Sequence, residues 1–380
     1  MIAIGKKKNL IYPILMILLS LINQIILIIL SYITDFGDYD LIQSYVMFIS
    51  EFITGLFLYK RNLNFLNKKK RENNSPKKDV QLIDKYEYRN IKKIDSGFKI
   101  MFLIISISFF DFYDYILAYT WIDDIEADYD LSVRERSQSV LALYSGILCY
   151  FLFNIPIYRH QKFSLIIIFI CLIIILITDF FYIYDSDFIQ LVFLSCIELF
   201  FHSTVDIIEK YLFEFNYINP FQLLMFEGAF GFLFTFIYSF IRNPFTISLS
   251  LDRKSFLFIS YMFAYIFISG FSNSYRLLTN KLFSPAGLSL VYYFLTPIKL
   301  IYNYFSTPDK ERLNIYYFGI NVFISFIISF CGCIYNELLV LLFCNLDQDT
   351  YYAISLRSTN EGNMMMNRLS TIEDLDLNSI

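Results

Sequence analysis

The chain has 380 residues, of which 57% are hydrophobic and only 17% are charged, and its mean hydropathy is +0.52. Soluble proteins carry about 25% charged residues, so this composition excludes a mainly water-soluble protein and indicates a polytopic membrane protein. The net charge of −4 argues against a nucleic-acid partner.

Ten apolar runs follow one another along the chain. A helix needs about 20 apolar residues to cross a hydrocarbon core of about 30 Å. The sequence predicts such helices at 10–33, 41–59, 100–121, 138–156, 163–184, 188–208, 220–241, 255–277, 286–305 and 315–343. The fourth and eighth runs are the weakest, and the last is long enough to continue beyond the bilayer.

Basic residues in the connecting segments set the expected orientation. Lys6, Lys7 and Lys8 precede a first run that is too long for a signal peptide and lacks a small-residue cleavage site, so we expect a retained helix. These lysines and the basic part of the polar loop 60–98 place both termini in the cytosol. The polar tail 345–380 is then a cytosolic extension.

The ten spans divide into five and five. The expected fold is an all-α integral membrane protein with two inverted five-helix repeats, 1–184 and 185–344, because an odd number of spans per repeat reverses the second one. In such transporters the substrate site lies near the midplane, where the repeats meet.

Cysteine and histidine offer little chemistry. No CxxC pair occurs among the six cysteines, and five of these residues lie inside apolar runs as expected for buried thiols. With only two histidines, a zinc site has few ligands available. The sequence therefore predicts neither a metal nor another cofactor.

Charged residues inside the apolar runs are the candidate site. Each costs about 2.5–3.5 kcal/mol at the bilayer centre and usually faces a cavity or a partner. Asp179 and Glu337 lie nearer helix ends and could reach the headgroups. The others are Glu51, Asp111, Asp114, Glu198, Asp206, Glu227 and Lys299.

Several of these residues have neighbours that suggest a role. Asp111 and Asp114 share one helical face with Tyr115, which suits a proton or cation relay or a pocket for a polar solute; a shallow, hydrated Asp114 is the alternative. Lys299 could bind an anionic substrate or neutralise Glu51, Asp111 or Glu227, and structural pairing within the bundle is equally open.

Two glycines follow Glu227. Gly228 and Gly231 form a small-residue face that lets another helix approach closely, so Glu227 is expected where helices meet.

The segment "EKYLFEFNYINPFQLLMFEGAFGF" resembles the junction of helices six and seven in the drug/metabolite transporter superfamily. It is most similar to the nucleotide-sugar-transporter-like branch (solute carrier family 35, F-type members, EamA-like). The matching positions are Glu209, Lys210, Leu212, Pro220, Gln222, Glu227, Gly228 and Gly231. Further matches are Glu51 in "MFISEF", Asp111, Leu117 and Tyr119 in "FDFYDYILAY", Lys299, and Cys344. Ser145 replaces an expected Arg, and Asp114 replaces a small residue.

This resemblance implies alternating-access transport of a small polar or anionic metabolite, with nucleotide sugars among the candidates, across an endomembrane. It implies no covalent chemistry, hence no enzyme. The expected substrate-binding residues are Glu51, Asp111, Tyr115, Glu227 and Lys299, and Gly228 and Gly231 pack helices. The expected partners are the lipid bilayer and a small-molecule substrate, with a homodimer left open. The alternatives are a membrane-embedded lipid- or sugar-modifying enzyme, against which two lone histidines argue, and a non-transporting scaffold.

Overall fold

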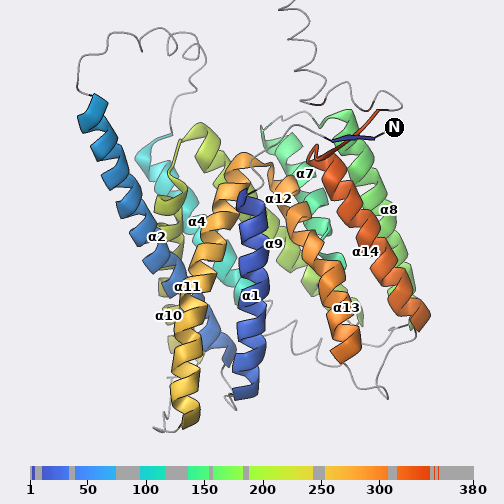
Figure 1. Cartoon of the computed structure of the whole chain (residues 1–380), viewed down its shortest axis with the longest axis horizontal. Helices are drawn as coiled ribbons and strands as arrows, with labels where there is room; N and C mark the ends of the chain where they lie inside the picture. The colour runs from blue at the N-terminus through green and yellow to red at the C-terminus, as the bar shows by residue number, and fades with distance from the viewer. Residues whose placement is uncertain are drawn as a thin grey trace, which may run out of the picture.

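The chain folds into a bundle of helices that run side by side (Figure 1). The computed structural model describes residues 2–4, 11–33, 39–73, 95–116, 136–153, 157–182, 188–242, 253–306, 315–342, 346 and 350. In chain order the elements are β1 (Ile2–Ile4), α1 (Ile11–Ile33), α2 (Tyr39–Asn73), α4 (Gly97–Ile116), α7 (Val140–Phe153), α8 (Arg159–Tyr182), α9 (Phe188–Phe215), α10 (Pro220–Arg242), α11 (Arg253–Leu282), α12 (Pro285–Tyr292), the 3₁₀ turn η3 (Tyr293–Leu295), α13 (Thr296–Ser306), α14 (Ile315–Tyr335) and β2 (Leu339–Leu341).

Several helices suit a bilayer. Within the described ranges, four are long and apolar enough to cross a membrane by length and composition: Arg159–Tyr182, Phe188–Phe215, Pro220–Ile241 and Ile315–Tyr335. Two shorter apolar stretches are Ile11–Leu27 and Val140–Leu152. These helices fit the expected all-α membrane protein.

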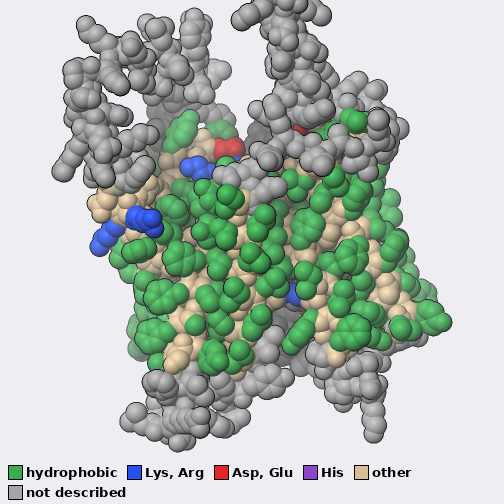
Figure 2. All heavy atoms as spheres, viewed as in Figure 1, with side chains coloured by type: hydrophobic (Ala, Val, Ile, Leu, Met, Phe, Trp, Pro, Cys, Tyr) green, Lys and Arg blue, Asp and Glu red, His purple; other side chains and the backbone are tan. Residues whose placement is uncertain are grey.

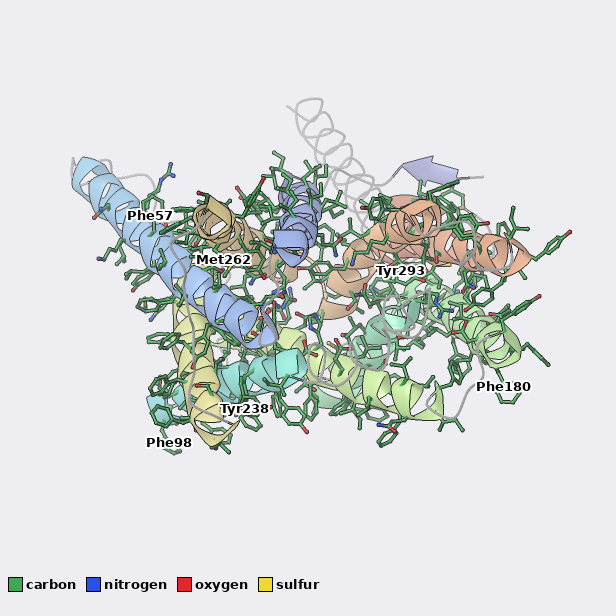
Figure 3. All side chains as sticks on the ribbon, turned by 90° about the horizontal axis from the view of Figure 1, so that it is seen from below. Phe57, Phe98, Phe180, Tyr238, Met262 and Tyr293 are labelled. Carbon is green, nitrogen blue, oxygen red and sulfur yellow. The ribbon has the colours of Figure 1, made fainter. Side chains whose placement is uncertain are left out.

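Polar and apolar side chains are distributed as a lipid environment requires. On α8, Phe169 and Phe181 are 55% and 77% exposed, whereas Ser164 and Asp179 are buried. Figure 2 shows hydrophobic side chains covering the middle of one face, with basic and acidic groups near its upper edge. Figure 3 places Phe57, Phe98 and Phe180 at the outer edge of the bundle and Tyr293 inside it. A surface this apolar is stable in lipid and not in water.

Helices α2 and α10, which are far apart in sequence, pack antiparallel. Near one end of the α2–α10 pair, the Tyr45 hydroxyl lies 2.7 Å from the Ser239 hydroxyl. Toward the other end, a Cβ on Gly55 would lie 2.6 Å from the backbone nitrogen of Met225. Other close pairs include α1 with α11, α8 with α14, α4 with α9, α4 with α10, α2 with α11, α7 with α9 and α7 with α12.

The predicted ninth span is broken. Helix α12 is capped at its start by the Ser284 hydroxyl, which accepts from the Gly287 N–H at 3.1 Å. The α-helix then gives way to the 3₁₀ turn η3, and α13 follows it. Pro297 explains the break, because it has no N–H to donate to the Tyr293 carbonyl and its ring would clash there.

The predicted final run ends earlier than expected, because α14 stops at Tyr335. The Leu338 N–H donates to the Cys333 carbonyl at 2.9 Å, and the Glu337 N–H donates to the Ile334 carbonyl at 3.1 Å. With Glu337 at φ 58°, this is a Schellman C-cap, which reverses the chain. The following strand β2 pairs antiparallel with β1.

Three predicted boundaries are wrong in the other direction. Helix α2 continues to Asn73, so the polar loop expected from residue 60 begins as helix, and residues 74–94 lie outside the described ranges. Helices α9 and α11 extend to Phe215 and Leu282, several residues beyond the expected ends. Of the tail 345–380, only Leu346 and Thr350 are described. These extensions bring polar residues of both helices inside the bundle.

Glycines set the contact between α2 and α10. A Cβ on Gly228 would collide with the backbone nitrogen of Phe52 and would lie 2.6 Å from the Phe48 carbonyl oxygen. A Cβ on Gly231 would collide with the Phe48 ring. The two helices can therefore approach this closely only because both positions lack a side chain.

Replacing Gly228 by Ala is expected to force α2 and α10 apart, because backbone atoms cannot move aside as a side-chain tip can. Overpacking of this kind costs about 1–3 kcal/mol, so the melting temperature in dodecyl maltoside should fall. Melting can be followed with a thiol-reactive dye, since Cys149, Cys171 and Cys331 are buried. The matched control is Gly319→Ala on α14, where a Cβ would meet nothing within 4 Å. Equal melting temperatures for the two variants would contradict this packing.

Candidate functional site

Two polar stripes face each other at the centre of the bundle. Glu198, His202, Asp206 and Glu209 follow one another at intervals of four, four and three residues along α9, which places them on one helical face. On α11, Asn273, Arg276 and Asn280 are spaced in the same way. The stripes meet because α9 and α11 pack together.

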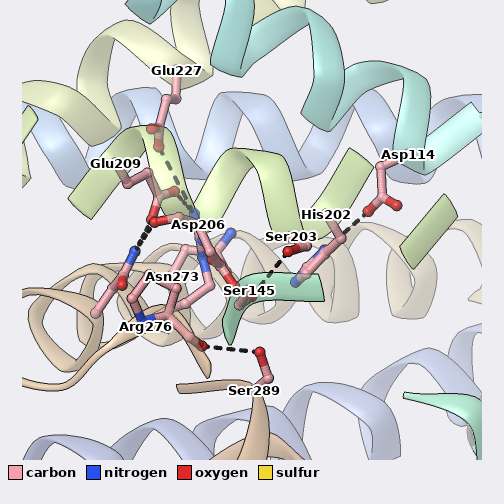
Figure 4. Close-up of polar contacts among 12 residues, drawn as sticks. Asp114, Ser145, His202, Ser203, Asp206, Glu209, Glu227, Asn273, Arg276 and Ser289 are labelled. Atoms are coloured by element: carbon pink, nitrogen blue, oxygen red, sulfur yellow. Dashed lines mark hydrogen bonds and ion pairs between the residues drawn. The ribbon is translucent and has the colours of Figure 1, made fainter. Parts of the chain in front are cut away.

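Arg276 is the centre of this contact. Its Nη1 lies 2.9 Å from Asp206 Oδ1, and its Nη2 lies 2.6 Å from Glu209 Oε1. Glu227, on α10, is the third acidic neighbour: its Oε2 lies 4.0 Å from Arg276 Nη2 (Figure 4). Asn280 Nδ2 donates to the second Glu209 oxygen at 2.8 Å. All five side chains are at most 9% exposed, so the cluster is an ion-pair network shielded from water.

Glu209 and Lys210 are adjacent in sequence but bind different partners. Glu209 binds Arg276, whereas the Lys210 Nζ donates to the carbonyls of Asn280, Lys281 and Phe283 at 2.8–3.1 Å. Successive residues on a helix point about 100° apart, which allows this division. Lys210 thus satisfies carbonyl groups that the end of α11 leaves without helical partners.

A polar cavity lies beside the network. Its volume is about 210 Å³, and six helices contribute its walls. It is lined by Met47, Glu51, Asp111, Asp114, Tyr115, Gln138, Leu141, Glu198, Leu199, His202, Asn273, Arg276 and Tyr292.

Two hydrogen bonds orient the carboxylates of this cavity. Asn273 Nδ2 donates to Glu51 Oε1 at 2.6 Å. His202 Nδ1 lies 3.2 Å from Asp114 Oδ2. The second oxygens, Glu51 Oε2 and Asp114 Oδ1, are buried and find no hydrogen-bond partner in the part of the chain that the structure describes.

A second cavity of about 360 Å³ lies nearer one end of the bundle. Helices α7, α9 and α11 contribute to both cavities, as does the α12 segment. Leu141, His202 and Arg276 line the central cavity, and Ser145, Lys210 and Leu282 line the second. The layer between them contains the Arg276 network and a 2.9 Å contact between the hydroxyls of Ser145 and Ser203.

The structure brings together three of the five predicted substrate-binding residues. Glu51, Asp111 and Tyr115 line the central cavity. Glu227 lies behind it, against Arg276, and Lys299 is a half-buried residue of α13 that is not part of its lining. The cation at ion-pair distance from Glu227 is Arg276 rather than Lys299. Leu117, Tyr119 and Cys344, which support the family resemblance, lie outside the described residues.

Arg276 and Asn273 are site residues that the sequence analysis missed. The predicted eighth span ends at residue 277, which would leave Arg276 at the headgroups. The polar spacing Asn273, Arg276, Asn280 continues the helical period past that point and is the signal that could have identified them.

A second buried ion pair lies away from the cavity. Arg136, just before α7, bonds to Asp179 of α8, and its Nη1 lies 2.7 Å from the Tyr317 hydroxyl of α14. The Tyr317 hydroxyl also donates to Asp179 Oδ1 at 2.8 Å. Arg136 and Asp179 are 0% and 1% exposed. Asp179 therefore pairs inside the protein, whereas its place near a helix end suggested that it could reach the headgroups.

Asp95 joins two helix ends outside the predicted spans. It accepts from Lys99 Nζ at 2.9 Å, from the Tyr211 hydroxyl at 2.7 Å and from Asn216 Nδ2 at 3.2 Å. Lys99 first, and then Tyr211, lower the pKa of Asp95 to about 2. A depressed pKa means that the contribution of this group to stability is complete above its ordinary pKa of 3.8 and is lost as the pH falls towards 2. Asp95 therefore stays ionised at any physiological pH.

No protein-family model matches the chain, and no curated protein matches it either. The class of protein is defined by the fold and the site alone. The chain is a helical protein of membrane type with a buried, carboxylate-rich cavity. Among the described residues, no group of three or more His, Cys, Asp or Glu side chains is placed to hold a metal ion.

Proposed function

We propose that this protein is a secondary transporter that moves a small polar solute by alternating access. The observation that supports it best is the central cavity, which lies among apolar-surfaced helices and is lined with charged side chains. Charged groups at membrane depth are costly and are retained where they line a solute or ion path.

The helix pairings support two inverted repeats of five spans. In this proposal α1, α2, α4, α7 and α8 correspond to α9, α10, α11, the broken α12–α13 span and α14. Exchanging the two sets turns the α1–α11 pair into α9–α4, and the α2–α11 pair into α10–α4. The pairs α2–α10, α8–α14 and α7–α12 turn into themselves, and all of these contacts occur. A broken span beside the site is a further feature of transporters with inverted repeats.

The layer between the two cavities provides a gate in this proposal. Four segments continue from one cavity to the other, and the Arg276 network and the Ser145–Ser203 contact close the way between them. Separating α7 from α9 would break the Ser145–Ser203 contact and open one side of this layer. The described conformation is then closed toward the second cavity.

Exposed basic residues indicate which end faces the cytosol. Lys60, Arg61, Lys99, Arg159 and Lys162 are exposed at the end of α2 and the starts of α4 and α8. These positions share the end of the bundle that holds the second cavity, since Tyr158 and Gln161 line it. Basic residues favour the cytosolic side, so the second cavity opens to the cytosol and the chain termini lie there. An endomembrane is the proposed location.

A cross-link across the gate tests transport. The double variant Ser145→Cys, Ser203→Cys should form a disulfide on oxidation, because the two hydroxyls are 2.9 Å apart. In vesicles preloaded with candidate solutes, the oxidised protein should show no counterflow, and reduction should restore it. The single variants are the controls and should exchange solute under both conditions. Undiminished counterflow by the cross-linked protein would rule out this gate, and no counterflow of any polar solute by the parent chain would rule out the function.

A further inference from the structure

We propose that the central cavity binds a solute with a protonated nitrogen, held by the carboxylates of Glu51, Asp111 and Asp114. This proposal rests on the transport function proposed above and gives its substrate class. It narrows the small polar or anionic metabolite that the family resemblance implies to a cationic solute.

The charges on the cavity wall favour a cation. Four carboxylates line the cavity, those of Glu51, Asp111, Asp114 and Glu198, and two basic groups, Arg276 and His202, accompany them. Arg276 is already bound by Asp206 and Glu209, neither of which lines the cavity, and Glu227 approaches it as well. Its charge is therefore balanced from behind the wall and is a poor partner for an anion.

His202 is engaged in the same way. Its Nδ1 lies 3.2 Å from Asp114 Oδ2, so its charge, when protonated, is directed at a carboxylate already within the wall. Glu51 has only the neutral amide of Asn273 as a hydrogen-bond donor. Among the described residues, Glu51 and Asp111 thus have no cation at ion-pair distance, and an anionic solute would be repelled.

Two unsatisfied oxygens point to where the solute binds. Glu51 and Asp114 are 2% and 5% exposed, and Glu51 Oε2 and Asp114 Oδ1 have no hydrogen-bond partner among the described residues. A buried acceptor without a donor is costly. An ammonium group has three N–H donors and no acceptor, so it suits acceptors of this kind.

The remaining walls of the cavity also suit a cation. The cavity volume is about 210 Å³, which leaves room for a small amine. Tyr115 and Tyr292 also line the cavity, and aromatic faces attract cations. The structure therefore assigns the site to a small organic cation.

Probes that are matched in size and differ in charge test this assignment. Three sets of compounds are used, and each set contains an amine, an alcohol and a carboxylic acid of nearly the same skeleton. The amines of the three sets are ethylamine, phenethylamine and tryptamine. Binding is measured by thermal shift and calorimetry on the full chain in dodecyl maltoside, at constant ionic strength. At least one amine should bind about tenfold or more tightly than its alcohol, since hydrogen bonds to charged groups contribute about 1.5–3 kcal/mol. The matching acid should bind no better than the alcohol.

Variants locate the binding to this cavity. Glu51→Gln and, independently, Asp111→Asn should remove the preference for the amine over the alcohol. Asp95→Asn removes the same charge outside the cavity and should leave the preference unchanged. The proposal is overturned if no amine binds better than its alcohol, if an acid binds best, or if sodium ions alone give the whole thermal shift.

Binding and transport fail separately in this design. Amine binding without counterflow would overturn the transport function and leave the cation site standing. Counterflow of a neutral or anionic solute, without amine binding, would leave transport standing and overturn the cation site.

Discussion

Arg276→Met is expected to leave little folded protein. The variant would leave Asp206 and Glu209 buried without their cation, because both carboxylates are at most 2% exposed. Removing one partner of a buried ion pair costs about 3–5 kcal/mol. The measurement is the yield of monodisperse protein in dodecyl maltoside and its melting temperature.

Compensating variants make this prediction specific. Adding Asp206→Asn and Glu209→Gln to Arg276→Met removes the unpaired charges and should recover most of the folded yield, since buried ion pairs are often replaceable by neutral groups. Arg276→Lys keeps the charge but cannot reach both carboxylates with a planar fork, so it should melt between Arg276→Met and the parent chain. If Arg276→Met folds and melts like the parent, the network does not hold α9 to α11.

The Arg136 cluster should be almost as sensitive. Arg136→Met leaves Asp179 buried, with the Tyr317 hydroxyl as its remaining hydrogen-bond donor among the described residues. We expect a loss of about 3–5 kcal/mol for the same reason, seen as a lower melting temperature. The double variant Arg136→Met, Asp179→Leu should recover much of it.

This second cluster also separates stability from solute binding. Arg136, Asp179 and Tyr317 do not line the central cavity. Protein of the double variant that folds should therefore keep the parent's order of affinity among amine, alcohol and acid. A reversed order would show that this cluster takes part in the site and is not only a link between α8 and α14.

How far the sequence predicts the site depends on the residue. Glu51, Asp111 and Tyr115 were identifiable because each stands in an apolar run whose helix is clearly delimited. Arg276 was not, because a helix end was expected one residue after it. Helix ends are the least determined feature of a sequence, and here five more residues of α11 turn a headgroup cation into the centre of a buried network.

Asp179 shows the same limit from the other side. It was expected to reach the headgroups because it lies near the end of α8, and it instead bonds to Arg136 and Tyr317. Those partners are 43 and 138 residues away in the chain. No local pattern encodes such a distance, since only the packing of α8 against α14 brings the groups together.

The sequence alone determines that this is a helical membrane protein, because apolar content and run length depend on residue types that need no partner to be read. It also determines which side chains are too costly to face lipid. Only the tertiary structure decides how those side chains are paired. Arg276 is bound from behind by Asp206 and Glu209, and His202 lies against Asp114, which leaves Glu51 and Asp111 on the cavity wall without an ion pair among the described residues. Coulomb interactions depend on distance in space and on burial, and both are properties of the packed bundle.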